Sequence, residues 1–438
     1  MTKLRAISLY TGAGGLDLGF EAAGFETAVA LEIDARCVAT LRANRSWSVI
    51  DRDISLVSTA ELLDAGDLAV GEADVLIGGP PCQPFSKSGF WAHGEARRLE
   101  DPRAGTLAAY MRVLEEAFPR AFLLENVEGL GFRGKDEGLE LIRTALQRIN
   151  AAHGSRYTAS IAVLNAADYG VPQLRRRLFV IGARDGATFE FPMATHVDPA
   201  LADPADNRPR YRTAWDAIHD IEPDDPSLEP KGKWARLLPS IPEGQNYLWH
   251  TERGGGEPLF GWRRRYWSFL LKLAKAQPAW TLQAQPGPAT GPFHWSSRRL
   301  STREMARLQT FPDDFSVIGN VADAQRQIGN AVPSLLAEAL ARAIARQLLN
   351  APIREDELAL SLPPAPPLPD PELTTKVPRA YLALRGDHDA HPGTGKGYRA
   401  EARGKAKSPR PEPRAAEPKT VSGFSRARRH SGSGIPKL

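Results

Sequence analysis

The first 185 residues alternate short apolar, β-prone runs with helical patterns, and this alternation constrains the fold more than any other feature. We predict strands at 4–9, 27–31, 75–77, 121–124 and 178–181, and helices from residue 16, at 107–117 and at 139–151. Strands that alternate with helices favour a parallel sheet with helices on both faces. The predicted fold class is therefore α/β.

The chain changes in character after residue 188. From about 190 to 297 Pro, Gly and Trp are common and periodicity fades, which indicates a separate, loop-rich domain. Helical periodicity returns at 302–309 and 334–349. Residues 361–371 read as a Pro-rich linker, and the basic sequence beyond about 375 is typical of disorder. We therefore expect segments at 1–188, 189–315, 316–350 and 351–438.

Composition excludes several classes of protein. Hydrophobic residues make up 42% and charged residues 25% of the chain, which is ordinary for a globular protein. No apolar run approaches the roughly 20 residues of a membrane helix. The N-terminus lacks a signal-peptide layout, and two cysteines form neither a disulfide framework nor a metal site. We expect a cytoplasmic protein without a metal or a membrane association, and a monomer.

Charge is concentrated at the C-terminus. The net charge is +4, yet residues 395–438 hold twelve Lys or Arg against three Glu. A basic tail on a nearly neutral body favours a nucleic-acid partner, although the signal is weak by itself.

The glycine-rich stretch Thr11-Gly-Ala-Gly-Gly15 lies between the first predicted strand and helix. Such a loop brings backbone close to a nucleotide-like ligand, or it only makes a tight turn. Glu32 ends the next strand, where a carboxylate can accept hydrogen bonds from both ribose hydroxyls, and Asp53 can meet an adenine amino group. The loop has no Lys for phosphates. These features favour an adenosine-containing cofactor without phosphates, namely S-adenosylmethionine.

Cys82 follows the predicted strand at 75–77 within Gly79-Pro-Pro-Cys-Gln-Pro-Phe-Ser86. A thiol on a proline-stiffened loop is placed as a nucleophile, although a free cysteine is more often buried and inert. Glu125 follows the strand at 121–124 and so lies at the same carboxyl edge of the sheet, where ligands bind in such folds.

Three arginines precede the last predicted strand of this region, at positions 175, 176 and 177. Alternate residues of an extended segment point to one side, so Arg175 and Arg177 share a face. Positive charge near Cys82 would favour the reactive thiolate. Arg176 points the other way and is more simply a solvated charge.

Six motifs in order resemble those of the bacterial DNA (cytosine-5)-methyltransferases of restriction–modification systems. They are Ser8-Leu-Tyr-Thr-Gly-Ala-Gly-Gly15, Gly79 to Ser86, Glu125-Asn-Val127, Tyr169-Gly-Val-Pro-Gln173 with Arg175 and Arg177, Arg299 to Gln309 with Phe311-Pro312, and Gln327-Ile-Gly-Asn-Ala-Val-Pro333. The resemblance covers about 4–185 and 280–348. Ser8 and Tyr10 depart from the family's usual Asp and Phe, and neither change threatens activity.

The resemblance implies a Rossmann-like S-adenosylmethionine-dependent fold with a smaller, loop-rich target-recognition domain. It implies that Cys82 attacks carbon 6 of a flipped-out cytosine in duplex DNA, and that Glu125, Arg175 and Arg177 assist. It also implies a cofactor pocket lined by Tyr10, Gly12, Gly14, Glu32, Asp53, Pro80, Asn330 and Ala331.

For DNA contacts the resemblance implies a mobile loop that begins at Gln83 and a reader in the middle region. The candidate residues are Gln83, Ser86, Lys87, Arg97, Arg263, Arg265 and Thr281. The recognised DNA sequence does not follow from these residues. A functional pairing with a restriction endonuclease is expected, without a stable complex.

Other functions stay open from sequence. An RNA methyltransferase of the same fold shares the motifs, and a DNA-binding relative could lack catalysis although every catalytic residue type is present. A nicotinamide-dependent oxidoreductase is disfavoured, because Asp17 stands where its glycine fingerprint requires Gly.

Overall fold

A seven-stranded sheet forms the centre of the molecule, whose computed structural model describes residues 3–81, 105–131, 137–261, 267–354 and 357–385. The strands follow the order β3-β2-β1-β4-β5-β8-β6 across the sheet. Their bounds are β1 Leu4–Leu9, β2 Phe25–Leu31, β3 Ser48–Ile50, β4 Val75–Gly78, β5 Ala121–Val127, β6 Ser160–Asn165 and β8 Arg176–Ala183. The five predicted strands are present, and β3 and β6 are additional.

β8 runs antiparallel to both of its neighbours, so the prediction of a parallel sheet is wrong at this edge. Residues 166–175 join β6 to β8 and hold only the 3-10 helix η5 (Ala166–Tyr169) and β7 (Gln173–Leu174). A parallel connection needs about a dozen or more residues, usually with an α-helix. The short connection therefore reverses the chain and lays β8 against β5.

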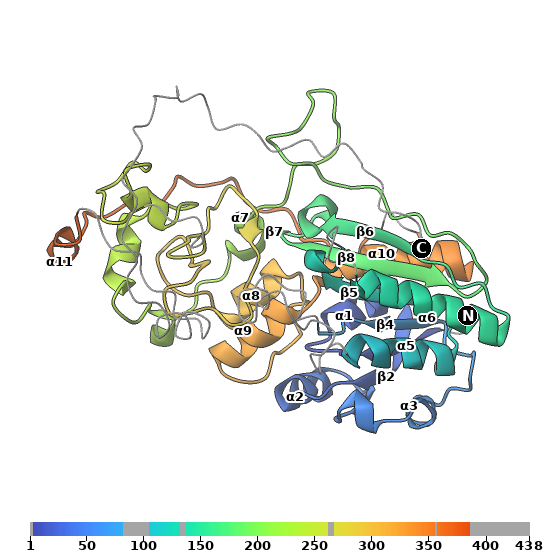
Figure 1. Ribbon diagram of the computed structural model, residues 1–438. Helices are drawn as coiled ribbons and strands as arrows, with labels where there is room; N and C mark the ends of the chain where they lie inside the picture. The colour runs from blue at the N-terminus through green and yellow to red at the C-terminus, as the bar shows by residue number, and fades with distance from the viewer. Residues whose placement is uncertain (1–2, 82–104, 132–136, 262–266, 355–356, 386–438) are drawn as a thin grey trace, which may run out of the picture.

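Helices cover both faces of the sheet (Figure 1). One face carries α1 (Gly15–Ala22) and α10 (Ser334–Leu349), and the other carries α3 (Thr59–Ala65), α5 (Gly105–Ala117) and α6 (Glu137–His153). Side chains alternate between two cores, as a pleated strand requires. In β5, Leu123 lies in the core with α1 and α10, and Phe122 lies in the other.

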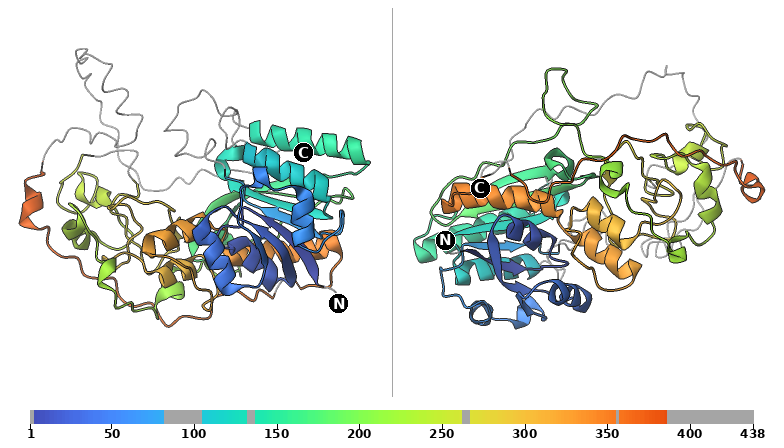
Figure 2. Two further views of the ribbon diagram at one scale, coloured as in Figure 1. Left: turned by 90° about the horizontal axis from the view of Figure 1, so that it is seen from below. Right: turned by 180° about the vertical axis from the view of Figure 1, so that it is seen from behind.

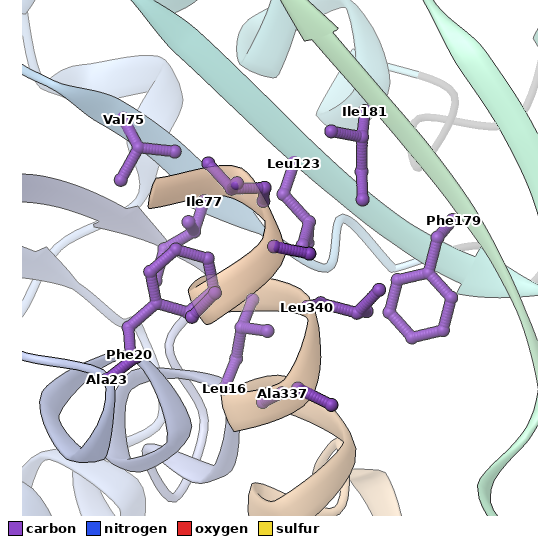
Figure 3. Packing of buried hydrophobic residues seen from close by; sticks show 14 of the residues in the cluster. Leu16, Phe20, Ala23, Val75, Ile77, Leu123, Phe179, Ile181, Ala337 and Leu340 are labelled. Atoms are coloured by element: carbon purple, nitrogen blue, oxygen red, sulfur yellow. The ribbon is translucent and has the colours of Figure 1, made fainter. Parts of the chain in front are cut away.

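α1 and α10 pack closely although more than 300 residues separate them. Figure 3 shows Ala337 and Leu340 of α10 beside Leu16 of α1, beneath the apolar face of the sheet. A Cβ atom added to Gly19 of α1 would lie 2.4 Å from the Cβ of Ala337. The absence of a side chain at Gly19 therefore lets the two helices approach. The seven-stranded sheet and the helices that cover its two faces are called the sheet lobe.

Two further regions lie beyond the sheet lobe (Figure 1). The joint consists of α7 (Ala214–Ile218), α8 (Thr302–Leu308) and α9 (Val321–Asn330), which share one core with Ala13 and Leu18 of the sheet lobe. The outer lobe is residues 226–293, and its described part, 226–261 and 267–293, has little regular structure besides β9 (Ala279–Trp280) and short 3-10 turns. Its core residues are Leu237, Leu238, Ile241, Tyr247, Leu259, Leu270, Phe293 and, from the C-terminal segment, Tyr381.

The chain after α10 extends along the molecule to α11 (Arg379–Leu382) at the outer lobe, as the right view of Figure 2 shows. The expectation that disorder begins near residue 375 is wrong up to residue 385, because Val377, Tyr381 and Leu384 pack into the outer core. The basic sequence at 395–438 lies outside the described residues.

In the part of the chain that the structure describes, no helix is long and apolar enough to cross a membrane.

Candidate active site

Glu125 lies beside the loop that leaves β4. A Cβ atom added to Gly79 would lie 3.0 Å from Glu125 Oε2, so the missing side chain allows this approach. The side-chain amide of Asn126 donates to the Pro80 carbonyl at 3.2 Å and ties the same loop to β5. Cys82 lies outside the described residues, two positions after Pro80.

Glu125 belongs to β5 rather than following it, because the strand continues to Val127. The antiparallel register opposes Val127 to Arg177 of β8. Arg177 Nε lies 3.0 Å from Glu125 Oε1, and the two side chains are only 17% and 12% exposed. The reversed strand therefore sets a guanidinium group against the carboxylate in a partly dry environment.

Burial raises the pKa of Glu125, and the charges of Arg177 and Arg175 oppose the rise. Desolvation disfavours the charged form of a carboxylate, whereas a nearby cation favours it. The net raised pKa makes the neutral acid accessible. Glu125 can thus donate a proton or a hydrogen bond to a ring nitrogen.

Arg175 is almost completely buried, with 1% of its surface exposed. Its Nη2 donates to the Gly329 carbonyl of α9 at 2.9 Å, whereas Nε and Nη1 have no partner among the described residues. Arg175 thus joins the sheet lobe to the joint and keeps buried donors available. Arg176 is exposed and forms an ion pair with Glu128.

Sequence reasoning assigned no role to Gln173, which connects three segments. Its amide nitrogen donates to the Leu308 carbonyl of α8 at 3.1 Å, and its amide oxygen accepts from the Leu282 amide at 3.2 Å. Thr281 donates its hydroxyl to the Leu174 carbonyl at 2.7 Å, beside the β7–β9 ladder. In the sequence, Gln173 belongs to the motif that also contains Arg175 and Arg177. In the structure, Gln173 links this motif to the outer lobe.

The loop after β1 turns sharply through three left-handed residues, namely Tyr10, Gly12 and Gly14, with φ of 56°, 58° and 80°. Its Gly12 amide donates to Glu32 Oε2 at 2.7 Å, and the Asp34 amide donates to Glu32 Oε1 at 2.8 Å. Burial raises the pKa of Glu32, which is 8% exposed. Each oxygen of a carboxylate has a further lone pair, so Glu32 can still accept from a pair of vicinal hydroxyl groups.

Tyr10 and Asp53 lie near each other at this edge of the sheet. Burial raises the pKa of Tyr10, and the Asp53 charge adds to the rise. The Tyr10 hydroxyl donates to the Thr106 carbonyl at 2.7 Å. Asp53 is exposed and caps the 3-10 helix η1 (Ile54–Leu56) through Oδ1, which accepts from the Ser55 amide and hydroxyl.

Two apolar residues beside these carboxylates escaped the sequence interpretation. Ile33, next to Glu32, is 63% exposed, and Leu56 of η1 is 73% exposed. Large aliphatic side chains left in solvent beside polar ligand groups suit a flat apolar ring. For Ile33 the signal that could have revealed it is an apolar residue directly after the carboxylate that follows a strand, whereas Leu56 has no comparable signal.

The start of α1 is covered by the turn between α9 and α10. A Cβ atom added to Gly15 would lie 2.4 Å from the Val332 carbonyl and 3.1 Å from the Ala331 Cβ. Asn330 ends α9 and is exposed, and Ala331 caps it. Residues distant in sequence thus border the glycine loop.

Together these groups suit S-adenosylmethionine, because a carboxylate for a ribose diol and exposed apolar side chains are present. Among the described residues, no group of His, Cys, Asp and Glu could hold a metal ion. Most of the expected DNA contacts lie outside the described residues, namely Gln83, Ser86, Lys87, Arg97, Arg263 and Arg265.

Comparisons with known proteins identify the family of this chain. Residues 4–346 match the family of C-5 cytosine-specific DNA methylases. The type II methyltransferase M.SacI of Streptomyces achromogenes is 42% identical over 374 residues, which cover 79% of this chain and 94% of the relative. M.NgoFVII of Neisseria gonorrhoeae, another type II methyltransferase, is 32% identical over 348 residues, covering 78% and 86%.

A solved structure of Spodoptera frugiperda DNMT2 has a TM-score of 0.54 at 15% identity and covers 78% of this chain and 99% of that one. At this identity the likeness concerns the fold alone, and it confirms the Rossmann-like methyltransferase architecture. Site geometry, family match and close relatives lead to one conclusion. The chain belongs to the C-5 cytosine-specific DNA methylases, enzymes that methylate carbon 5 of cytosine in DNA with S-adenosylmethionine as the methyl donor.

Proposed function

We propose that this enzyme methylates one cytosine within a specific duplex DNA sequence and that Cys82 is its nucleophile. The observation that carries the proposal is the Glu125–Arg177 pair beside the loop that leads to Cys82. A buried acid next to a candidate thiol suits covalent catalysis with acid assistance.

In the proposed reaction the Cys82 thiolate forms a bond to carbon 6 of cytosine. The electrons of the 5–6 double bond shift so that carbon 5 becomes nucleophilic, and Glu125 donates its proton towards ring nitrogen 3. The raised pKa of Glu125 supports this role. Arg177 holds Glu125 in place and stabilises it whenever the carboxylate is charged.

Glu32 would hold the ribose of S-adenosylmethionine, which when bound would supply the methyl group for carbon 5 and leave as S-adenosylhomocysteine. The proton on carbon 5 then leaves to a base, the carbon 6–sulfur bond breaks with Cys82 departing as the thiolate, and ring nitrogen 3 returns its proton to Glu125. The target carbon is inaccessible in stacked DNA, so the cytosine must leave the helix at a cost of about a few kcal/mol.

We further propose that the outer lobe reads the DNA sequence and that methylation protects the host from a cognate restriction endonuclease. Gln173 and Thr281 support the first point, because their hydrogen bonds join this lobe to β7, which directly precedes the strand that carries Arg177. The second rests on relatives named as type II methyltransferases.

The test is sequencing for 5-methylcytosine in DNA from cells that express the chain, compared with cells that express Cys82→Ala. We expect 5-methylcytosine at one short sequence only with the unaltered chain. DNA from those cells should then resist an endonuclease that cuts this sequence.

A second experiment separates DNA from RNA as the substrate. Duplex DNA and transfer RNA compete as methyl acceptors for the purified enzyme, and labelling of RNA alone would overturn the proposal. Duplexes with 5-fluorocytosine at the target should become covalently attached to the protein, because carbon 5 then has no proton to lose. No attachment by an active enzyme would contradict the covalent route.

A further inference from the structure

The residues after α10 form a strap, defined as residues 357–385, which runs from the sheet lobe across the joint to the outer lobe (Figure 2). Near its start the strap contacts Glu338 of α10, whose side chain is completely buried. Glu338 Oε1 accepts from the Ala359 amide at 2.7 Å, and Oε2 accepts from the Leu360 amide at 2.9 Å. Arg342 neutralises the same carboxylate at 2.8 Å. The strap is thus fixed to the sheet lobe by a buried charge.

The strap next contacts the segment that leads into α7 of the joint. Arg212 donates to the carbonyls of Leu362 and Pro363, the second at 2.7 Å. The indole nitrogen of Trp215 donates to the Pro366 carbonyl at 3.1 Å. These bonds satisfy backbone acceptors of a proline-rich stretch that forms no helix or strand.

A buried lysine then joins the strap to the outer lobe. Lys275 has a side chain only 4% exposed, and its Nζ contacts Glu372 of the strap at 3.0 Å and Glu243 of the outer lobe at 3.1 Å. The same Nζ donates to the Asp370 carbonyl at 3.2 Å. Glu243 also accepts from the Glu372 amide at 2.7 Å. A buried ammonium group needs such partners, so the strap completes this charge cluster.

The far end of the strap enters the core of the outer lobe. The Tyr381 ring stacks on Trp234 with centroids 6.0 Å apart and an interplanar angle of 20°. Its hydroxyl donates to the Lys233 carbonyl at 2.7 Å. Tyr381 is 8% exposed, whereas Leu373, earlier in the strap, is 95% exposed. The strap therefore contacts the outer lobe through particular residues rather than along its whole length.

The match to the methylase family ends at residue 346, so the strap lies beyond the shared region. We propose that it positions the outer lobe relative to the sheet lobe and so sets the affinity for duplex DNA, without touching the reacting groups. The inference rests on the proposed function of the outer lobe as the DNA reader. A lobe that is already fixed loses less freedom when DNA binds, which favours tight binding.

The experiment compares full-length enzymes with substitutions in the strap, using a duplex that carries the methylated sequence. Tyr381→Ala removes the stacked ring, and Glu372→Gln removes one charge from the Lys275 cluster without making a cavity. We expect the KM for DNA to rise about tenfold and about threefold, respectively, with kcat and the KM for S-adenosylmethionine within about twofold. Tyr381→Phe keeps the ring and should restore a nearly normal KM.

Leu373→Ala is the matched control, because the side chain lies in the same segment but in solvent. It should leave every constant unchanged. A lower thermal unfolding temperature with an unchanged KM for DNA would overturn the proposal, because the strap would then only stabilise the fold. A fall in kcat alone would overturn it as well, because the strap would then act on the chemistry.

A second readout does not depend on activity. In Tyr381→Ala, amide hydrogen exchange without DNA should accelerate at residues 235–250 of the outer lobe and stay unchanged in β1, β4 and β5. Equal exchange rates in variant and unaltered chain would contradict positioning by the strap. If the unaltered chain transfers no methyl group to DNA, the proposed function fails, while the exchange result still judges the strap.

Discussion

The sheet lobe and the outer lobe stabilise their functional groups in different ways. In the sheet lobe, Glu32 follows β2 directly and its amide donates to the Ile50 carbonyl, and Glu125 lies within the β5–β8 ladder, so hydrogen bonds fix the backbone of both. The outer lobe has short 3-10 turns around aromatic contacts such as Trp234 with Phe260 and Phe269, and it needs Tyr381 from the strap. Chemistry requires atoms at fixed positions, whereas the DNA-reading surface that we propose for the outer lobe can vary if its core is retained. Substitutions of functional groups in the sheet lobe should therefore lower kcat, whereas substitutions in the outer lobe should raise the KM for DNA.

The sharpest test of this division is Cys82→Ala, in the segment that follows β4 in the sequence. Methyl transfer should fall by about 10⁴-fold or more, because loss of the proposed nucleophile removes the proposed covalent route. The dissociation constant for specific duplex DNA should change little, as a gel-shift titration would reveal. Weak binding by a folded variant would break the comparison, since the sheet lobe would then supply affinity too.

Glu125→Gln should lower kcat by about 10²–10⁴-fold, because the glutamine cannot donate the proton. The raised pKa of Glu125 also predicts how the rate depends on pH. The acid form is lost as pH rises through that pKa, so its contribution to the rate is lost in the same range. The falling limb of the pH–rate profile should disappear in the variant. An unchanged falling limb would assign it to another group.

Asp17→Asn tests how the stability of the sheet lobe depends on pH. Burial raises the pKa of Asp17 to about 7 from the ordinary 3.8. A raised folded-state pKa means that the stability contribution is complete below the unfolded pKa and is lost as pH rises through about 7. The variant's free energy of unfolding relative to the unaltered chain should therefore increase from pH 4 to 8, by up to about 4 kcal/mol. Urea titrations across this range measure it, and a flat difference would refute a buried acid.

Gly19→Ala probes the contact between α1 and α10. The added methyl group would lie 2.4 Å from the Ala337 Cβ, so the free energy of unfolding should fall by about 1–3 kcal/mol despite the better helix propensity of Ala. Gly105→Ala is the control, because no described residue lies within 4 Å of the added atom. If both variants are equally stable, the helices have room to separate.

Trp234→Ala disturbs the packing of the outer lobe, as Gly19→Ala disturbs that of the sheet lobe. The KM for DNA should rise about fivefold, with kcat unchanged within about twofold, because the ring packs far from the reacting groups. Steady-state kinetics with duplex DNA as the varied substrate would measure the split. A large fall in kcat would show that the outer lobe takes part in the chemistry.

Sequence predicts the sheet lobe better than the outer lobe for a physical reason. Apolar periodicity reports burial, so the strands and helices of the sheet lobe are visible in it. Periodicity does not report strand direction, and the reversal of β8 that sets Arg177 against Glu125 follows only from the short connection. The outer lobe depends on contacts between distant aromatic residues, and Tyr381 lies in a segment whose composition resembles disorder.

The residues of the candidate site also divide into those that the sequence predicts and those that it does not. Glu32, Glu125 and the glycine loop can be found from spacing, because strand ends meet at one edge. The roles of Gln173 and Arg175 in joining the lobes depend on α8 and α9, which lie over 130 residues away. Long-range pairs of this kind leave no local pattern in the chain.

The contact between α1 and α10 has a consequence for synthesis on the ribosome. Domains generally fold from the N-terminus as they emerge, at about 5–20 residues per second. Here the first helix stays uncovered until Ser334–Leu349 has been made, after the whole outer lobe. A chain that stops within the outer lobe would have Glu32 and Glu125 but would lack the helix that closes their sheet. Premature termination should therefore yield an inactive fragment rather than a methyltransferase that modifies DNA without reading it.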